Sequence, residues 1–191
     1  MKKSEIRSNI KAKRNSLSQS EVDLFSEKCF SQLLNKFNFK DKNIGLFFPI
    51  KKFNEPNTFL FFDELIVSGA NIYAPKSDFT TNTMEFHLIK SIDDLQINQF
   101  GIPEPKFDNK VEAKELDVIM IPLLAINKMG YRVGYGKGFY DRFLLYCTEN
   151  TLKIGINILS DILEIEDISP SDIPLDYCVN PKSIICFNDK D

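Results

Sequence analysis

Three glycines at alternate positions constrain this chain more than any other feature of its sequence. They form Gly134-Tyr135-Gly136-Lys137-Gly138, which follows Arg132 and precedes Phe139-Tyr140-Asp141-Arg142. Glycine has no Cβ, so the segment can turn tightly and direct several backbone N–H groups toward one point. Apolar residues at helical spacing come next, so the turn should lead into a helix whose N-terminal end also favours an anion. The block predicts a phosphate-binding loop.

The charged neighbours of the glycine block favour the same interpretation. Lys137 and Arg132 bring positive charge, and Asp141 is placed to hold a divalent cation that bridges phosphate oxygens. The spacing matches neither the Walker loop nor the dinucleotide-binding G-x-G-x-x-G pattern. The alternative is an ordinary glycine-rich turn between a strand and a helix, with Lys137 and Arg142 merely solvated.

Composition restricts the class of protein. The chain has 191 residues, of which 43% are hydrophobic, so one domain over residues 1–191 is expected. A net charge of -3 gives no electrostatic footprint for nucleic acid or an anionic membrane, and no apolar run approaches the length of a membrane span. We therefore expect no nucleic-acid or membrane partner and a cytoplasmic location.

Cysteine and histidine usage excludes several kinds of site. Cys29, Cys147, Cys178 and Cys186 are scattered without a C-x-x-C pair, which indicates reduced structural thiols and argues against zinc. His87 is the only histidine and lies in an alternating, strand-like segment. Mechanisms that need two or more histidines are excluded.

Hydrophobic patterning alternates between helices and strands, which predicts an α/β domain with a mostly parallel sheet. Helices are expected at about residues 4–15, 18–37, 57–67 and 139–147, and strands at about 43–49, 71–74, 83–90, 117–121, 153–158 and 183–187. Residues 98–112 are expected to be an ordered loop. Because ligands bind beyond the carboxyl ends of strands in such folds, the site should involve residues 49–57, 75–83 and 122–138.

Five segments, in order along the chain, carry a resemblance to one family. They are Lys3-Ser4-Glu5-Ile6-Arg7, Glu55 after a strand, Gly101-Ile102-Pro103-Glu104-Pro105, Asp117-Val118-Ile119-Met120-Ile121-Pro122, and the stretch from Gly130 to Arg142. The R-x-G-x-G-x-G-[FY]-Y-D pattern in the last segment is highly specific. From Lys3 to about Pro181 the chain resembles the 5-formyltetrahydrofolate cyclo-ligase family, also called 5,10-methenyltetrahydrofolate synthetase.

The resemblance implies a three-layer Rossmann-like domain, similar to the NagB/RpiA/CoA-transferase-like fold. We also expect the protein to act as a monomer. The family resemblance implies ATP- and Mg2+-dependent closure of 5-formyltetrahydrofolate, with or without a polyglutamate tail, to 5,10-methenyltetrahydrofolate, with release of ADP and phosphate. The γ-phosphoryl group passes to the formyl oxygen, N10 attacks the activated carbon, and phosphate departs. Such chemistry needs cations, backbone amides and a metal rather than a histidine base, which suits a chain with one histidine.

The resemblance also implies roles for individual residues. The ATP contacts are Lys3, Arg7, Arg132, Gly134, Gly136, Lys137, Gly138 and Tyr140, of which Arg132, Lys137 and Tyr140 are also catalytic. The folate contacts are Glu55, Phe100, Ile102 and Tyr140, with Pro103 beside them, and the magnesium ligands are Asp141 and Asp172. Several of these residues have a structural alternative: a solvated basic helix face for Lys3 and Arg7, an exposed acid for Glu55, packing for Phe100, Ile102 and Pro103, compensation of the helix dipole for Asp141, and a turn for Asp172.

One loop departs from the family pattern. The family usually has Pro-Gly-Leu-Ala-Phe-Asp where this chain has Pro122-Leu123-Leu124-Ala125-Ile126-Asn127. We interpret the change as drift in a supporting loop. Two alternative functions remain open: a sugar-phosphate isomerase or CoA-transferase-like enzyme, and a folate- or nucleotide-binding protein that has lost catalysis.

Overall fold

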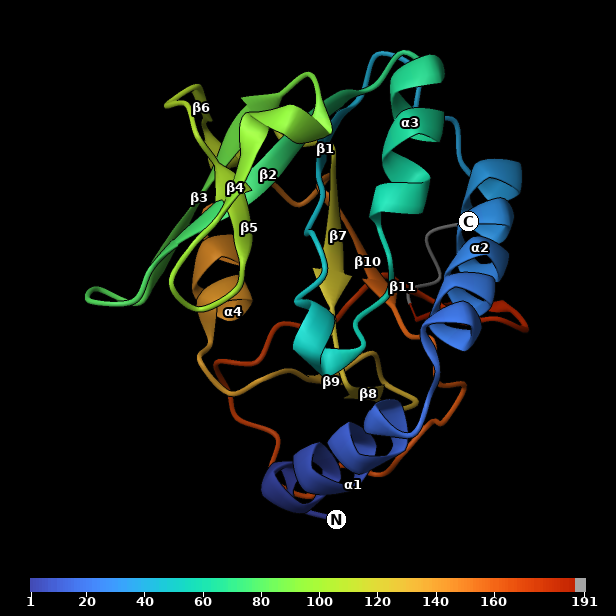
Figure 1. Cartoon of the computed structure of the whole chain (residues 1–191). Coiled ribbons are helices and arrows are strands. Elements are labelled where there is room, and N and C mark those ends of the chain that lie inside the picture. The colour runs from blue at the N-terminus through green and yellow to red at the C-terminus, as the bar shows by residue number, and fades with distance from the viewer. Residues whose placement is uncertain (188–191) are drawn as a thin grey trace.

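An eight-stranded sheet runs through the centre of the computed structural model, which describes residues 1–187 (Figure 1). Its strand order is β12-β11-β10-β7-β1-β2-β3-β6. The strands are β1 (Asn43–Gly45), β2 (Asn71–Asp78), β3 (Thr83–Ile89), β6 (Lys110–Val111), β7 (Val118–Pro122), β10 (Leu152–Ile156), β11 (Tyr177–Val179) and β12 (Ile184–Cys186). The five inner strands from β11 to β2 pair in parallel, and antiparallel strands flank them at both edges. The predicted mostly parallel sheet is confirmed.

Helices cover both faces of this sheet, which gives three layers. α2 (Gln19–Lys36) and α3 (Phe59–Val67) cover one face, and the short α4 (Phe139–Leu144) covers the other (Figure 1). Strand β7 shows why its sequence is apolar throughout. Val118 and Met120 join the core beneath α2 and α3, whereas Ile119 and Ile121 join the core beneath α4. Because both faces of this central strand are buried, its side chains on either face are apolar.

Local sequence accounts for the start and the buried stripe of α2. Ser18 is the N-cap: its hydroxyl accepts from the Glu21 amide at 3.3 Å, and the Glu21 side chain reaches back to the Ser18 amide at 2.8 Å. This reciprocal pair is a capping box. On the buried side of the helix, Phe30 stacks on Phe61 of α3 with ring centroids 4.6 Å apart.

Helix α1 (Lys3–Asn15) lies beyond the end of the sheet rather than on either face (Figure 1). Its Ile6 and Ile10 are buried in a separate apolar cluster with Leu124, Ala125 and Val133. Those partners come from the segment that forms the small hairpin β8 (Ala125–Ile126) and β9 (Arg132–Val133). This packing brings the N-terminal basic residues to the glycine block.

Several predicted elements needed correction. Strand β2 continues to Asp78 and forms an antiparallel hairpin with β3, so residues 75–83 are mostly strand and not a loop. The predicted loop at 98–112 contains β5 (Pro103–Pro105), which pairs with β4 (Leu95–Ile97), and also β6. The short β11 was missed, β1 stops at Gly45, and α4 ends at Leu144. Short 3-10 turns occupy residues Lys51–Phe53, Ile92–Asp94 and Ala113–Glu115. The proline and charged residues of these segments disfavour strands, so their sequence predicts loops. They form strands because they pair with neighbouring strands of the sheet.

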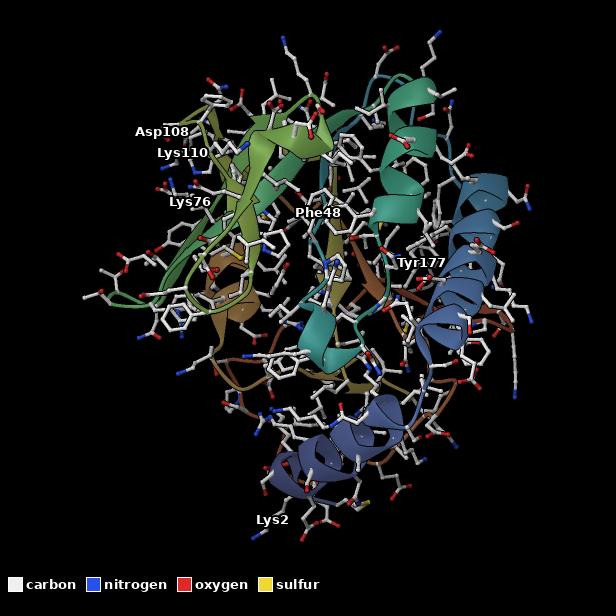
Figure 2. All side chains as sticks on the ribbon, in the orientation of Figure 1. Lys2, Phe48, Lys76, Asp108, Lys110 and Tyr177 are labelled. Carbon is white, nitrogen blue, oxygen red and sulfur yellow. The ribbon has the colours of Figure 1, made fainter. Side chains whose placement is uncertain are left out.

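His87 is a buried structural residue on β3. Its side chain lies beside Asp108, with Nδ1 3.2 Å from the Asp108 carboxylate, at the β3–β6 edge where Figure 2 labels Asp108 and Lys110. Burial lowers the pKa of His87, so the imidazole is neutral at pH 7.

Within residues 1–187, none of the cysteines forms a disulfide, and no helix has the length and apolarity needed to cross a membrane.

Candidate active site

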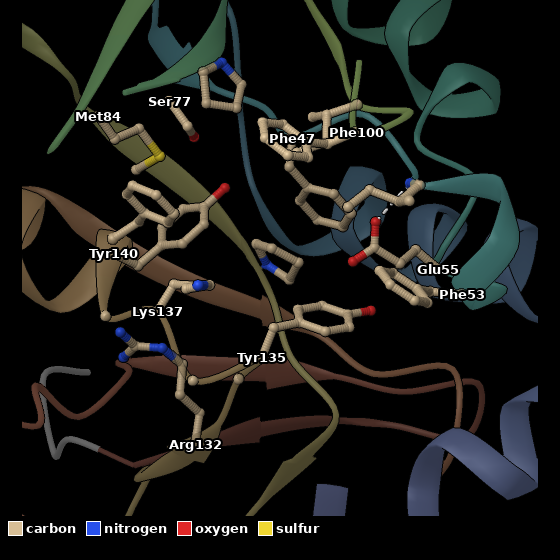
Figure 3. A pocket seen from close by; sticks show the side chains of 18 of the residues that line it. Phe47, Phe53, Glu55, Ser77, Met84, Phe100, Arg132, Tyr135, Lys137 and Tyr140 are labelled. Atoms are coloured by element: carbon tan, nitrogen blue, oxygen red, sulfur yellow. Dashed lines mark hydrogen bonds between the residues drawn. The ribbon is translucent and has the colours of Figure 1, made fainter. Parts of the chain in front are cut away.

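A cavity of about 410 Å³ lies where the inner strands end (Figure 3). Pro75 and Ser77 of β2, Pro122 of β7, and Phe47 and Phe48 just after β1 contribute to its wall. Every residue that the sequence assigned to the site lines this one cavity: Lys3, Arg7, Glu55, Phe100, Ile102, Arg132, Gly134, Gly136, Lys137, Gly138, Tyr140, Asp141 and Asp172. Segments distant in sequence are therefore brought together as expected.

The backbone of the glycine block contacts the Arg7 side chain of α1. Gly136 and Gly138 have φ angles of 96° and 68°, in the left-handed region that favours glycine. The Arg7 side chain crosses the block, and its Nε donates to the Gly134 carbonyl at 2.8 Å. A Cβ on Gly136 would lie 3.2 Å from the Arg7 guanidinium carbon. Glycine at position 136 thus serves both the turn and the close approach of Arg7.

On the expectation from the sequence that this block binds ATP, Gly136→Ala should raise KM for ATP by roughly tenfold, because a left-handed alanine costs about 1–2 kcal/mol and its methyl displaces Arg7. Gly134→Ala is the matched control, since that glycine has an ordinary φ and open space around its missing Cβ. Steady-state kinetics at varied ATP would separate the two. Equal KM values in both variants would show that the close approach of Arg7 is irrelevant to ATP.

Positive side chains surround the block. Arg132 is 8% exposed, and its guanidinium donates to Asp141 Oδ1 and to the Ile173 carbonyl, both at 2.7 Å. Burial lowers the pKa of Arg132 while the Asp141 carboxylate opposes that shift. Lys3 forms an ion pair with Asp172. Lys137 is exposed and, within the part of the chain that the structure describes, has no carboxylate partner. Lys137 is thus a cation available to a ligand.

The two predicted metal ligands keep oxygens available. The hydrogen bonds from described residues reach Asp141 only at Oδ1, from Arg132 and the Ile173 amide, and Asp172 only at Oδ2, from Lys3 and the Ser169 amide. Within residues 1–187, no group of three or more Asp, Glu, His or Cys side chains is arranged so that it could hold a metal ion. Magnesium usually takes one or two carboxylates and completes its shell with phosphate and water, so the donor set fits that ion.

Aromatic side chains line a large part of the cavity. Phe79 from the β2–β3 turn packs between Phe100 and Phe139, with ring centroids 4.5 and 5.2 Å away. Near Glu55, Phe53 stacks on Tyr135 with centroids 5.2 Å apart. Figure 3 shows Tyr140, Lys137 and Arg132 toward one side, with Phe53 and Glu55 toward the other. A flat ligand with polar edges suits this part of the cavity.

Glu55 is the buried carboxylate of the aromatic part. It is 4% exposed, and the Ile50 amide donates to its Oε2 at 2.7 Å. Burial raises the pKa of Glu55, while the Ile50 amide, the Tyr135 hydroxyl and the charge of Arg14 oppose the rise. The alternative of an exposed loop acid is therefore wrong.

Sequence reasoning missed Arg14, which is fully buried at 0% exposure. Its guanidinium donates to the Leu123 carbonyl and to the Tyr135 hydroxyl. One signal was present: Arg14 continues the four-residue spacing of Ile6 and Ile10, the buried stripe of α1. A basic residue on an apolar stripe indicates a buried cation.

A family model for the 5-formyltetrahydrofolate cyclo-ligase family matches residues 1–181. The chain belongs to this family. A cyclo-ligase from Haemophilus influenzae is 30% identical over 91% of this chain and 95% of its own length. One from Mycoplasma pneumoniae is 31% identical over 94% of this chain and 99% of its own. The solved structure of Aquifex aeolicus 5,10-methenyltetrahydrofolate synthetase is 31% identical, has a TM-score of 0.81, and covers 100% of this chain and 95% of that one.

A second solved structure, a 5,10-methenyltetrahydrofolate synthetase from Mycoplasma pneumoniae, is 29% identical with a TM-score of 0.73 over 95% of this chain and 100% of that one. These relatives support the Rossmann-like fold and the enzyme class. They exclude the isomerase and CoA-transferase alternatives for this member of the cyclo-ligase family.

The loop that departs from the cyclo-ligase pattern is well packed. Positive φ among the described non-glycine residues occurs at Asp41, Asn54 and Asn82, so Leu123 replaces glycine without backbone strain. Asn127 accepts from the Met129 and Tyr131 amides through Oδ1, both at 2.9 Å. An aspartate oxygen could accept the same two bonds, so the change to asparagine preserves the turn.

Gly155→Ala should destabilise the protein by about 1–3 kcal/mol, because overpacking a filled core forces side chains out of their rotamers. A Cβ at Gly155 would lie 2.5 Å from both Leu123 Cδ2 and Leu175 Cδ1. Urea unfolding measures the loss. In Leu123→Ala/Gly155→Ala the new methyl group occupies space that leucine has vacated, so the double variant should lose less stability than the sum of the singles. Additive losses would mean that Leu123 does not fill the space above Gly155.

Proposed function

We propose that the protein catalyses the ATP- and Mg2+-dependent cyclisation of 5-formyltetrahydrofolate to 5,10-methenyltetrahydrofolate, with release of ADP and phosphate. One observation carries the proposal. A single cavity joins a glycine block surrounded by Lys3, Arg7 and Lys137 to an aromatic wall with buried Glu55. The first part suits a polyphosphate, and the second suits a pterin ring with N–H groups at its edge.

The reaction uses this juxtaposition directly. The formyl oxygen attacks the γ-phosphorus of ATP. The bond between that phosphorus and the oxygen that bridges it to the β-phosphate breaks, and ADP leaves. N10 then attacks the formyl carbon, the phosphorylated oxygen leaves as inorganic phosphate, and N10 loses its proton. The protein supplies position and compensating charge, because neither step requires an enzyme nucleophile.

We assign the charged side chains as follows. Lys137 binds the transferred phosphoryl group, Lys3 and Arg7 bind the other phosphates from α1, and Gly134, Gly136 and Gly138 allow the backbone to approach them. Arg132 is held rigidly by Asp141 and Ile173, so its charge needs no reorganisation during the reaction. Asp141 and Asp172 would hold Mg2+, which would neutralise part of the phosphate charge.

Tyr140, Glu55, Phe100 and Ile102 are assigned to the folate. Burial raises the pKa of Tyr140, so its hydroxyl remains protonated at neutral pH and can donate a hydrogen bond to the reacting formyl group. Glu55 accepts from pterin N–H groups. Phe100 and Ile102, with Pro103, form the apolar wall.

The decisive test follows formation of the methenyl chromophore from 5-formyltetrahydrofolate in complete mixtures and in mixtures lacking ATP or Mg2+. Signal only in the complete mixture, with one ADP released per methenyl product, is expected. Folate binding without ATP-dependent turnover would instead support the catalytically inactive alternative.

We further propose that residues 1–191 act as one domain and as a cytoplasmic monomer on mono- or polyglutamylated substrate; residues 188–191 lie outside the described part.

A further inference from the structure

Arg14 occupies a place that the proposed chemistry leaves unexplained. It is a cation with 0% exposure, and its Nε has no hydrogen-bond partner among the described residues. A buried charge is costly unless hydrogen bonds and an opposite charge compensate it. Arg14 does not line the cavity, so it does not contact a ligand there.

Besides the Leu123 carbonyl, which accepts one hydrogen bond, the partners of Arg14 lead to the folate side of the cavity. Its guanidinium donates to the Tyr135 hydroxyl at 3.3 Å. That hydroxyl faces the Glu55 carboxylate and favours its charged form (Figure 3). The Tyr135 ring in turn stacks on Phe53.

The segment that carries Glu55 also contacts the backbone of Arg14. Asn54, the neighbour of Glu55, donates through Nδ2 to the carbonyls of Arg14 at 2.7 Å and Leu17 at 3.1 Å. Asn54 holds a left-handed φ of 45° as it does so. The end of α1 and the segment that carries Glu55 are therefore joined by two independent connections.

We propose that Arg14 is a positioning residue that acts through Tyr135 to hold the Glu55 carboxylate in its folate-binding orientation. The inference rests on the proposed function of this cavity. It explains why an arginine replaces an apolar residue on the buried stripe of α1. It also makes α1 serve both substrates, with Lys3 and Arg7 at the ATP side and Arg14 at the folate side.

The electrostatic surroundings of Glu55 define what should change. Arg14 approaches from α1, Tyr135 and Tyr140 belong to the glycine segment, and Lys11 and Lys52 line the same cavity. Removing the Tyr135 hydroxyl or the Arg14 charge leaves the ionised form of Glu55 less stabilised. The pKa of Glu55 then rises further, and the acid limb of kcat/KM for folate moves to higher pH.

The test compares Tyr135→Phe, Arg14→Lys and Arg14→Met with Lys13→Ala, a control that removes an exposed cation of α1 paired with Asp161. Tyr135→Phe should raise KM for 5-formyltetrahydrofolate by roughly tenfold, leave KM for ATP unchanged, and shift the acid limb upward. Arg14→Met should act in the same direction, and Arg14→Lys less, because lysine retains the charge. Lys13→Ala should match the wild type.

A second arm repeats Tyr135→Phe in a Glu55→Gln background, where the added effect on folate KM should fall below about twofold if the residues act as one unit. Reduced resistance to urea in Tyr135→Phe and Arg14→Lys, with unchanged folate KM and unchanged acid limb, would overturn the proposal in favour of simple packing. An equal effect of Tyr135→Phe in both backgrounds would overturn it too. If the wild type itself shows no ATP-dependent turnover, the proposed function fails instead.

Discussion

Replacing Lys137 with alanine should lower kcat/KM for ATP by roughly 100- to 1,000-fold, the usual cost of removing one preorganised donor from a developing charge. The side chain is exposed on the glycine block, lines the cavity, and has no ion-pair partner among the described residues. Its charge is therefore available to phosphate without first breaking a protein contact. Nearby Lys3 and Arg132 are already paired with carboxylates, so they compensate poorly for its loss.

The fold should survive this change because Lys137 contributes no core packing. Its backbone carbonyl still accepts from Arg142 at 2.6 Å, so the turn is retained. Lys128→Ala is the matched control, since it removes an exposed lysine from the neighbouring loop that does not line the cavity. Steady-state kinetics at varied ATP and urea unfolding measure the two properties. Wild-type turnover in Lys137→Ala would contradict the assigned phosphate role.

The grouping of the residues in the proposed phosphate half of the site was predictable because local sequence determines much of it. Gly136 and Gly138 have positive φ angles that favour glycine. Lys3 and Arg7 lie four residues apart and so share one face of α1, however the helix packs on the rest of the protein. The apolar runs and the Ser18 cap likewise express local physics, so α2, β7 and the mostly parallel sheet followed from them.

The remainder depends on contacts between segments distant in sequence. Nothing local in residues 98–112 requires β5 to pair with β4, or β6 with β3. The spacing of Arg14 places it on the buried stripe of α1, but its partners Leu123, Tyr135 and Asn54 come from segments that only the tertiary fold brings beside the helix. Tyr135 received no role because its orientation toward Glu55 exists only after α1 and the Lys51–Phe53 turn have docked.

The position of α1 also bears on how the two substrates are coordinated. One helix contributes Arg7 to the glycine block and is anchored by Asn54 beside Glu55. A shift of α1 would therefore disturb the phosphate contacts and the folate carboxylate together. In the proposed reaction, which transfers the γ-phosphoryl group of ATP to a formyl oxygen, a shared rigid support keeps both reacting groups in place.

Glu55→Gln should raise KM for 5-formyltetrahydrofolate by about 10- to 100-fold, because a hydrogen bond to a charged acceptor contributes roughly 1.5–3 kcal/mol and each 1.4 kcal/mol is tenfold. Glutamine can still accept from the Ile50 amide through its carbonyl oxygen, but its NH2 group opposes the pterin N–H donors. KM for ATP should not change, because Glu55 lies in the aromatic part of the cavity. Glu55→Asp is the companion variant, which keeps the charge but shortens its reach.

Stability separates this loss of binding from damage to the fold. The pKa of Glu55 is raised by burial, so the folded state binds its proton more tightly than the unfolded state does. Stability is consequently lost as pH rises from the usual carboxyl pKa through the raised value, and a neutral glutamine escapes that penalty. Glu55→Gln should therefore match or exceed the wild type in urea at pH 7, with the advantage disappearing below the usual carboxyl pKa. Weaker folate binding accompanied by lower stability at pH 7 would show instead that Glu55 is a structural acid, and unchanged folate KM would remove it from the substrate site.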